Sequence, residues 1–430
     1  MPGPLPGPPP GPLDGVKVVE FTEIIAGPLA GMLLADLGAE VIKVEPPWGE
    51  PWRFVQAFLP TESRVFMAYN KGKRGLTLDL KTAGARQILE RLILQADVVL
   101  VNYRPDVVSK LGLDYDSLSA LNPRLVYCDL TAYGRQGPDA HRPGYDVVLQ
   151  ALSGMLAAEG KMSEGTPQPI VSTPLIDTTS GFSLAWCVCA GLYARERTGL
   201  GQKVETTLLG TTLVHLAMRF LQVENIDQPV RDQTLEDLAA FRAASVSYQD
   251  ILNFYQESHS PLPGNIYYRV YATQDGAIAV GCLSDPLRRR LLDVLGLTDI
   301  RFEPGHDPTS PESMAFGRDL EKKADGMFLE KTTCQWLEIL DNRNIPAGPV
   351  RFIEEMVDHP QVIASGLLAE VKHKEAGRVK MVGPLAKFNG TFPPLASASP
   401  ALGQHTAEIL LELGYTAEEV DQWRQDGVVV

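Results

Sequence analysis

The chain has 430 residues, of which 44% are hydrophobic and 21% charged, and its formal net charge is −14. This length exceeds what one ordinary domain needs, so we expect two domains. The acidic balance disfavours a nucleic-acid-binding protein, which usually carries a basic face, but it allows a local basic pocket for a phosphorylated ligand. None of the apolar runs approaches the roughly 20 residues that cross a membrane, so we predict no membrane partner.

The N-terminus and the cysteines indicate in which cellular compartment the protein resides. Residues 1–12 alternate proline and glycine without the basic and apolar regions of a signal peptide, and we interpret them as a flexible tail. The five cysteines are odd in number and scattered, which argues against a disulfide framework and favours buried free thiols. These features predict a cytoplasmic protein.

The first part of the chain alternates apolar runs with amphipathic segments. The predicted elements are strands at 16–21, 41–45, 76–80, 97–102 and 125–130, and helices around 29–37, 82–94 and 115–121. This alternation is typical of an α/β fold, a parallel sheet with helices on both faces. Such sheets bind ligands at the loops beyond the carboxyl ends of their strands.

The second part changes character. A long apolar helix is predicted at 177–194, then a strand at 202–206 and a helix to about 223. The polar stretch 225–264 is predicted to be irregular. Strands at 267–272 and 278–282 flank an Asp275-Gly276 turn, which is a hairpin pattern. Two short helices, about 406–413 and 417–425, end the chain.

These patterns divide the chain into five segments. After the tail at 1–12, we predict the first part of a large domain at 13–223, a linker at 224–264, a small α+β domain at 265–345, and a return segment at 346–430 that completes the large domain.

Several catalytic motifs are absent from the sequence. There is no phosphate-binding P-loop, no H-E-x-x-H zinc motif and no G-x-S-x-G nucleophile elbow. The stretch 199–204 fails the dinucleotide-binding fingerprint at its last position and precedes a strand. The sequence therefore disfavours P-loop kinases, dehydrogenases, zinc proteases and standard hydrolases, and we expect no metal.

Three loops lie where the predicted sheet would bind a ligand. The turn at Gly27-Pro28 opens a helix whose first amides can receive phosphate or carboxylate, although a plain strand–helix turn is the alternative. Residues 70–75 are strongly basic, and residues 102–105 carry Arg104, with Lys110 one helical turn further. Clustered cations suit polyanionic phosphates, whereas ordinary solvated loops are the competing interpretation.

One carboxylate stands apart from the other acidic residues. Asp177 lies between apolar residues at the start of the long helix. An aspartate there can be an ordinary N-cap. A sheltered carboxylate is also a workable nucleophile, and the residues alone leave both interpretations open.

Taken together, these stretches resemble the class III CoA-transferases, the family of formyl-CoA and carnitine CoA-transferases and of α-methylacyl-CoA racemase. The resemblance runs from about Leu13 to Val430. Its strongest markers are residues 26–28, 38–45, 70–81, 102–105, 144–146, 177–181 and 197–205, with the 275–276 turn. It implies a Rossmann-like large domain with a parallel sheet and a smaller α+β domain, in a homodimer of two interlocked rings.

The resemblance also implies the residues of the site. Asp177 matches the catalytic aspartate of the family. The residues matching the coenzyme A site are Ile24, Ile25, Leu78, Lys81, Asn102, Tyr103, Arg104, Lys110, Leu111, Arg142 and Tyr145. Lys73 and Arg74 are further candidates for its phosphates. The implied partners are an acyl-CoA and a carboxylic acid, with no nucleic acid.

The implied activity is transfer of coenzyme A from an acyl-CoA donor to a free carboxylic acid, through an aspartyl mixed anhydride and an aspartyl-CoA thioester. A racemase is the first alternative, but Tyr145 replaces its histidine, and a tyrosine with a pKa of about 10 is a poor base at neutral pH. A non-catalytic CoA-binding protein is the second. Ile25 replaces a glutamine of the formyl-CoA branch, and residues 256–264 replace its glycine-rich loop, which disfavours formate and oxalate as substrates.

Overall fold

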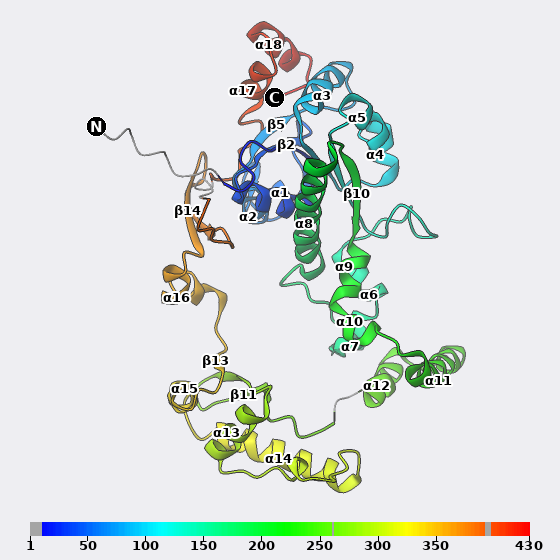
Figure 1. The fold of residues 1–430 in the computed structure, drawn as a ribbon, viewed down its shortest axis with the longest axis vertical. Coiled ribbons are helices and arrows are strands. Elements are labelled where there is room, and N and C mark those ends of the chain that lie inside the picture. Colours follow the sequence, from blue (N-terminus) through cyan, green and yellow to red (C-terminus); the bar gives the residue numbers. More distant parts are fainter. Residues whose placement is uncertain (1–10, 260–261, 392–396) are drawn as a thin grey trace. The chain divides into compact units, whose positions relative to one another are not determined.

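A computed structural model describes residues 11–259, 262–391 and 397–430. The chain forms two compact units (Figure 1): the first runs to Leu252 and resumes from Gln361 to Val430, and the second comprises Asn253–Pro360. Most of the predicted N-terminal tail, and residues 260–261 within the stretch that replaces the glycine-rich loop, lie outside the described residues. The segment boundaries given above stay predictions.

A six-stranded sheet forms the centre of the first unit. Its order is β10 (Gln202–Thr207), β7 (Val126–Thr131), β6 (Val98–Val101), β1 (Lys17–Phe21), β2 (Glu40–Glu45) and β5 (Arg74–Thr77). Every neighbouring pair is parallel, which confirms the predicted parallel α/β architecture. The largest shift among these strands is β5, which ends at Thr77 instead of residue 80.

Helices cover both faces of this sheet, because alternate strand residues point to opposite sides. Val19 joins the core beneath α3 (Ala83–Gln95), α5 (Tyr115–Leu121), α17 (Thr406–Glu412) and α18 (Ala417–Gln425). Val18 joins the core beneath α1 (Ala26–Asp36), α6 (Asp146–Leu152), α8 (Leu175–Thr198) and α9 (Leu208–His215). Residues from the end of the chain therefore complete the core of the first unit.

Smaller elements complete the first unit. They are 3₁₀ helix η1 (Pro51–Arg53), β3 (Ala57–Leu59), β4 (Glu62–Ser63), α2 (Arg64–Asn70), α4 (Pro105–Leu111), α7 (Met155–Glu159), β8 (Met162–Ser163), β9 (Thr166–Pro167), α10 (Ala217–Phe220), β14 (Leu368–His373) and β15 (Gly377–Val382). The β14–β15 hairpin is antiparallel.

Helix α8 is longer and more apolar than the sequence analysis recognised. By length and composition alone it could cross a membrane, contrary to the prediction that no run approaches that length. Core helices of soluble proteins pass the same test, and α8 buries Ile176, Leu184 and Val188 in the core that it shares with α1 and the sheet. Its opposite face leaves Trp186 71% exposed.

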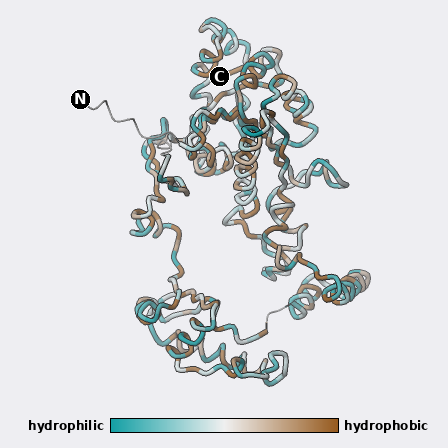
Figure 2. The backbone as a smooth tube through the Cα atoms, in the orientation of Figure 1, coloured by the Kyte–Doolittle hydropathy of each residue, from teal (hydrophilic) through white to brown (hydrophobic). Residues whose placement is uncertain are grey.

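The second unit contains a small antiparallel sheet of β11 (Tyr268–Ala272), β12 (Ala277–Gly281) and β13 (Ala347–Pro349). The predicted hairpin is confirmed, with the amide of Thr273 donating to the carbonyl of Gly276 at 2.9 Å. The other elements are α13 (Asp285–Leu295), η2 (Ile300–Phe302), α14 (Pro311–Phe328), α15 (Thr333–Asn342) and η3 (Ile353–Met356). Helix α16 (Pro360–Ala364) begins at the last residue of this unit and continues into the first. In each unit, hydrophobic and hydrophilic stretches alternate along the chain (Figure 2).

The prediction that residues 225–264 are irregular is wrong. Most of this stretch forms α11 (Glu224–Ala243) and α12 (Tyr248–His259). Helix α11 has no buried residue, and its apolar side chains such as Ile226 and Val230, which lie one turn apart, are exposed. Its many Glu, Gln, Leu, Ala and Arg residues still favour a helix. Polar composition was mistaken for irregular structure.

All five cysteines are free. The predicted burial holds for Cys128 and Cys282, whereas Cys187 and Cys189 are half-buried and Cys334 is exposed.

Candidate active site

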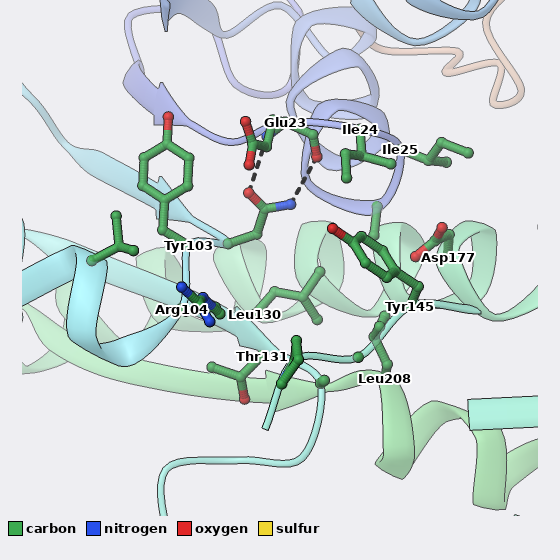
Figure 3. Close-up of a pocket in the computed structure, with 16 residues that line it drawn as sticks. Glu23, Ile24, Ile25, Tyr103, Arg104, Leu130, Thr131, Tyr145, Asp177 and Leu208 are labelled. Carbon is green, nitrogen blue, oxygen red and sulfur yellow. Dashed lines mark hydrogen bonds between the residues drawn. The ribbon is translucent and has the colours of Figure 1, made fainter. Parts of the chain in front are cut away.

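The strand order of the large sheet reverses between β1 and β6. From β1 the chain proceeds to β2 and β5 on one side, and from β6 to β7 and β10 on the other. Open parallel sheets bind ligands at such a point, beyond the carboxyl ends of the strands. A pocket of about 290 Å³ lies there, lined by the loops that follow β1, β6 and β7 and by the start of α8 (Figure 3).

The loop after β1 is held by the loop after β6. The side-chain amide of Asn102 accepts a hydrogen bond from the Glu23 N–H at 3.0 Å and donates one to the Glu23 carbonyl at 2.9 Å (Figure 3). Burial raises the pKa of the Glu23 carboxyl, and the nearby Glu50 raises it further. Asn102, which follows β6, therefore fixes the two peptide groups on either side of Glu23 in the pocket wall.

The next two residues bring helix α1 to the pocket. Ile24 has a positive φ of 74°, and its N–H donates to the Glu50 carboxylate at 2.7 Å. Ile25 is the N-cap of α1 and makes no side-chain capping bond. The first amides of a helix have no partner within it, and Ala26 lines the pocket. The start of α1 thus offers N–H donors to a bound ligand.

Asp177 lies in the first turn of α8, whose N-cap is Pro174. Its carboxylate lines the pocket, and among the described residues it has no hydrogen-bond partner. The capping oxygen belongs instead to Asp146, which accepts from the amides of Ile176 at 2.8 Å and Asp177 at 3.1 Å. The ordinary N-cap interpretation of Asp177 is therefore wrong.

Burial raises the pKa of Asp177 to about 7, and the Asp146 carboxylate adds to the rise. Near neutral pH about half of the Asp177 side chains are therefore ionised. A carboxyl that is shifted by desolvation and lies in a pocket is typical of functional sites.

Gly181 sets the distance between α8 and α1. A Cβ atom at this position would lie 2.8 Å from the Ala26 carbonyl oxygen and 2.9 Å from the Leu29 Cβ atom. Only a glycine allows the two helices to approach so closely. One turn before Gly181 the same helix presents Asp177, so this contact brings the carboxylate to the loop after β1.

The predicted site residues fall into three groups. With Asp177, the first pocket is lined by Ile24, Ile25, Asn102, Tyr103, Arg104 and Tyr145. A second pocket, of about 150 Å³, is lined by Leu78, Lys81 and Leu111 and shares Tyr103 with the first. Lys110 and Arg142 line neither of these two pockets, and both are exposed. Lys110 pairs with Asp106 at 3.2 Å, and Arg142 pairs with Asp139 at 3.0 Å.

The basic loop at 70–75 does not present free cations, as the sequence analysis expected. Lys73 is fully buried and pairs with Glu20 at 2.8 Å. Arg74 pairs with Glu408 and Glu412, both at 2.8 Å. The prediction that Lys73 and Arg74 contact phosphate is wrong, because Lys73 is buried in its ion pair and Arg74 is the first residue of β5, away from the carboxyl ends of the strands.

Sequence reasoning gave no role to three acidic residues of the site. Asp146 follows Tyr145 directly in a family marker, and that position could have drawn attention to it. Glu23 lies within the turn before α1. Glu50 lies between a glycine and a proline, a context that gives no sign of its hydrogen bond to Ile24.

Comparison with known proteins agrees with this arrangement. The family model described as CoA-transferase family III matches residues 13–406. The chain belongs to CoA-transferase family III. The resemblance identified in the sequence is thereby confirmed, and the protein is a CoA-transferase enzyme.

Relatives match over nearly the whole chain. An acyl-CoA transferase of Fusarium pseudograminearum is 31% identical over 97% of this chain and 88% of its own. The succinyl-CoA:glutarate CoA-transferase of Mus musculus is 29% identical over 97% of this chain and 90% of its own. The crystal structure of a mutant of Rv3272 from Mycobacterium tuberculosis has 31% identity and a TM-score of 0.73, covering 93% of this chain and 98% of that one.

Proposed function

We propose that this enzyme moves coenzyme A from an acyl-CoA to a free carboxylic acid through covalent intermediates on Asp177. The observation that carries the proposal is the state of this carboxyl. It lines the pocket at the reversal of strand order, has no hydrogen-bond partner among the described residues, and has a pKa raised to about 7. A sheltered carboxylate of this kind is a competent nucleophile.

The reaction consists of acyl exchanges between carboxylates and a thiolate. The Asp177 carboxylate attacks the thioester carbonyl, the carbon–sulfur bond breaks, and CoA thiolate leaves behind a mixed anhydride. The thiolate then attacks the aspartyl carbonyl and releases the donor acid, which gives an aspartyl-CoA thioester. The acceptor carboxylate attacks this thioester, the carbon–sulfur bond breaks, and CoA thiolate leaves behind a second anhydride. The thiolate attacks the acceptor carbonyl, which releases the new acyl-CoA and restores Asp177.

Two features of the pocket favour these steps. A carboxylate of raised pKa is a stronger base, and therefore a better nucleophile, than one of ordinary pKa, while about half of it remains ionised at neutral pH. Each tetrahedral intermediate carries an oxyanion that needs N–H donors. Ile25 and Ala26, at the start of α1, line the pocket with Asp177, and we assign the role of donor to their amides.

The two neighbouring pockets provide room for the cofactor. We place the thioester end of coenzyme A in the pocket of Asp177, among Ile24, Ile25, Asn102, Tyr103, Arg104 and Tyr145. Tyr103 joins this pocket to the one lined by Leu78, Lys81 and Leu111, which takes the remainder of the molecule. The exposed cations of Lys110 and Arg142 attract its phosphates.

The pocket also favours a class of acid. Ile25, Leu130 and Leu208 give the wall near Asp177 an apolar character. Such a wall favours an acyl group with a carbon chain over formate or oxalate.

We further propose that the enzyme is a cytoplasmic homodimer of interlocked rings, as the family resemblance implies. Large apolar side chains stay exposed on the first unit, including Trp186 on α8 and Met218 on α10. Such side chains mark interaction surfaces when they gather in patches, and twofold homodimers are the commonest oligomers. Light scattering that gives a monomer mass at micromolar concentration would contradict the dimer.

The covalent mechanism is tested by Asp177→Ala. Transfer should fall by at least about a thousandfold, because the only acylated oxygen is lost. The variant should still fold and bind acyl-CoA, since Asp177 caps no amide in α8. In the wild type, acyl-CoA followed by hydroxylamine should leave a hydroxamate on the peptide that contains Asp177.

Asp285→Ala is the matched control, because Asp285 also lies in the first turn of a helix, α13, but in the second unit. It should keep full activity. Full activity of Asp177→Ala, or a hydroxamate on another peptide, would show that the nucleophile lies elsewhere.

A further inference from the structure

Ile24 adopts a backbone conformation that its side chain disfavours. Its φ is 74°, in the left-handed region, where a β-branched residue is an outlier. The other non-glycine residues with positive φ in the described part of the chain are polar: Gln56, Glu164, Ser245 and Asn344. Ile24 lines the pocket next to Ile25, the N-cap of α1. Strain of this kind persists only where the surroundings impose it.

Buried charges supply that constraint. The Glu50 carboxylate, 2% exposed, accepts the Ile24 N–H at 2.7 Å with one oxygen. Its other oxygen lies 3.1 Å from the ammonium of Lys43, which is fully buried. The same ammonium donates to the Thr22 carbonyl at 2.8 Å. Lys43 and Glu50 therefore link the peptides on either side of Glu23.

We propose that Glu50 is a positioning residue of this active site, which holds Ile24 in the left-handed conformation and so keeps Ile25 and the first amides of α1 turned toward Asp177. This inference rests on the proposed function and deepens it. Glu50 does not line the pocket that contains Asp177, so it acts through Ile24.

A carboxylate is the group suited to this position, because it has two acceptor oxygens and faces two donors. A glutamine of nearly the same size has one acceptor oxygen and one NH₂ group. Whichever way its amide turned, the NH₂ would face either the Lys43 ammonium or the Ile24 N–H. Glu50→Gln therefore breaks one of the two links without opening a cavity. Lys43 keeps its contacts with Glu20 and Thr22.

The experiment measures Glu50→Gln against the wild type. Displacing reacting groups by about 1 Å costs on the order of a hundredfold in rate, and we expect a fall of that size in kcat for CoA transfer. The Kd of a nonreactive acyl-CoA thioether should change much less, because the second pocket is untouched. Amide exchange of the peptide containing Ile24 should become faster.

Glu62→Gln is the matched control. Glu62 is as buried as Glu50 and also pairs with a cation, Arg53 at 2.9 Å, but no hydrogen bond or ion pair joins it to residues 22–26 in the described chain. It should keep the wild-type kcat and the wild-type exchange at Ile24. A merely structural effect of removing a buried charge would appear in both variants alike.

Ile24→Gly separates positioning from folding. Glycine adopts positive φ without a side-chain penalty, so Glu50→Gln should cost less than about tenfold in kcat when Ile24→Gly is already present, as expected for two sites coupled through one contact. Equal losses in both backgrounds would overturn the proposal. So would a folded Glu50→Gln protein with full kcat and unchanged exchange at Ile24.

A wild-type enzyme without transferase activity would refute the proposed function only. In that case the exchange rates of the Ile24 peptide decide the structural part by themselves. Faster exchange in Glu50→Gln but not in Glu62→Gln supports the hold on Ile24, and equal exchange in all three proteins overturns it.

Discussion

The two walls of the active-site pocket differ in how their polar groups are bonded. On the wall formed by the loop after β1, Asn102 holds the N–H and the carbonyl of Glu23, and Glu50 holds the N–H of Ile24. On the wall formed by α8, the carboxylate of Asp177 has no hydrogen-bond partner among the described residues. The groups that must stay in place are bonded from neighbouring strands, and the group that reacts is left free.

The charges behind the first wall are better explained by geometry than by stability. Arg53 pairs with Glu45 at 2.7 Å and with Glu62 at 2.9 Å, and all three side chains are buried. Burying such ions costs several kcal/mol of desolvation each, which their attraction often only offsets. A network of this kind contributes little net stability, but its directional bonds hold η1 against β4, behind the pocket wall and outside the residues that line the pocket.

Among the tests of this difference between the two walls, the pH dependence of Asp177 has the largest expected effect. The nucleophile is the ionised form of Asp177, whose pKa is raised to about 7. As pH falls below 7, kcat/KM should drop about tenfold per pH unit, reaching about a hundredfold near pH 5. A profile that stays flat between pH 5 and 8 would contradict this assignment.

Two variants show which carboxyl is titrating. Asp146→Asn keeps an oxygen for the amides at the start of α8 but removes the charge that helps to raise the pKa of Asp177, so the profile should move to lower pH. Glu62 also has a pKa raised to about 7, chiefly by burial. Since Glu62 does not line the pocket, Glu62→Gln should leave the profile unchanged.

The second prediction concerns Gly181→Ala, a substitution that should separate the two walls of the pocket. In Gly181→Ala the new methyl group would meet the Ala26 carbonyl oxygen at 2.8 Å, so α1 and α8 must separate. Overpacking of this kind costs about 1–3 kcal/mol of stability, and kcat should fall because Asp177 moves away from the loop after β1. Thermal unfolding and steady-state rates measure both effects.

Gly326→Ala is the control for that substitution. Gly326 lies within helix α14, and a Cβ atom there would have no heavy atom within 4 Å. It should raise stability by about 0.5–1 kcal/mol, because alanine favours helices over glycine. If Gly181→Ala behaved in the same way as Gly326→Ala, the close contact between the walls would contribute neither to stability nor to kcat.

The sequence predicted the wall formed by α8 better than the wall formed by the loop after β1. Apolar runs such as 98–101 revealed the parallel sheet, and the apolar context of Asp177 marked it as unusual. The bonds of the other wall join residues distant in the chain: Glu50 meets Ile24, and Asn102 meets Glu23. Local patterns contain no information on such pairings.

The same limitation explains the wrong predictions. Lys73 lies in a basic loop, and its sequence neighbours suggested a phosphate contact, whereas Glu20 neutralises it from another strand. Helix α11 was missed because its composition is mostly polar, and its few apolar residues, such as Ile226 and Val230, stay exposed in the fold. Partner identity and burial are set by the assembled fold.

The smallest expected effects concern the cations that we assign to coenzyme A. Lys81 lines the second pocket, whereas the side chain of Lys110 is 75% exposed and pairs with Asp106. Exposed charges contribute about 0.2–1 kcal/mol each, so Lys81→Ala should raise the acyl-CoA KM about two- to fivefold and Lys110→Ala by less. Added salt should shrink both effects through screening, and kcat should stay constant because neither cation touches Asp177.

Lys323→Ala is the matched control for Lys110→Ala. Lys323 is also exposed and also pairs with an aspartate one helical turn before it, Asp319 at 2.7 Å, but it belongs to the second unit. Its removal should leave the acyl-CoA KM unchanged at every salt concentration. If Lys81→Ala and Lys110→Ala gave the same result as Lys323→Ala, coenzyme A would have to approach Asp177 by a path other than the one through Tyr103. In that case the wall formed by the loop after β1, with the amides at the start of α1, would be the reference for locating that path.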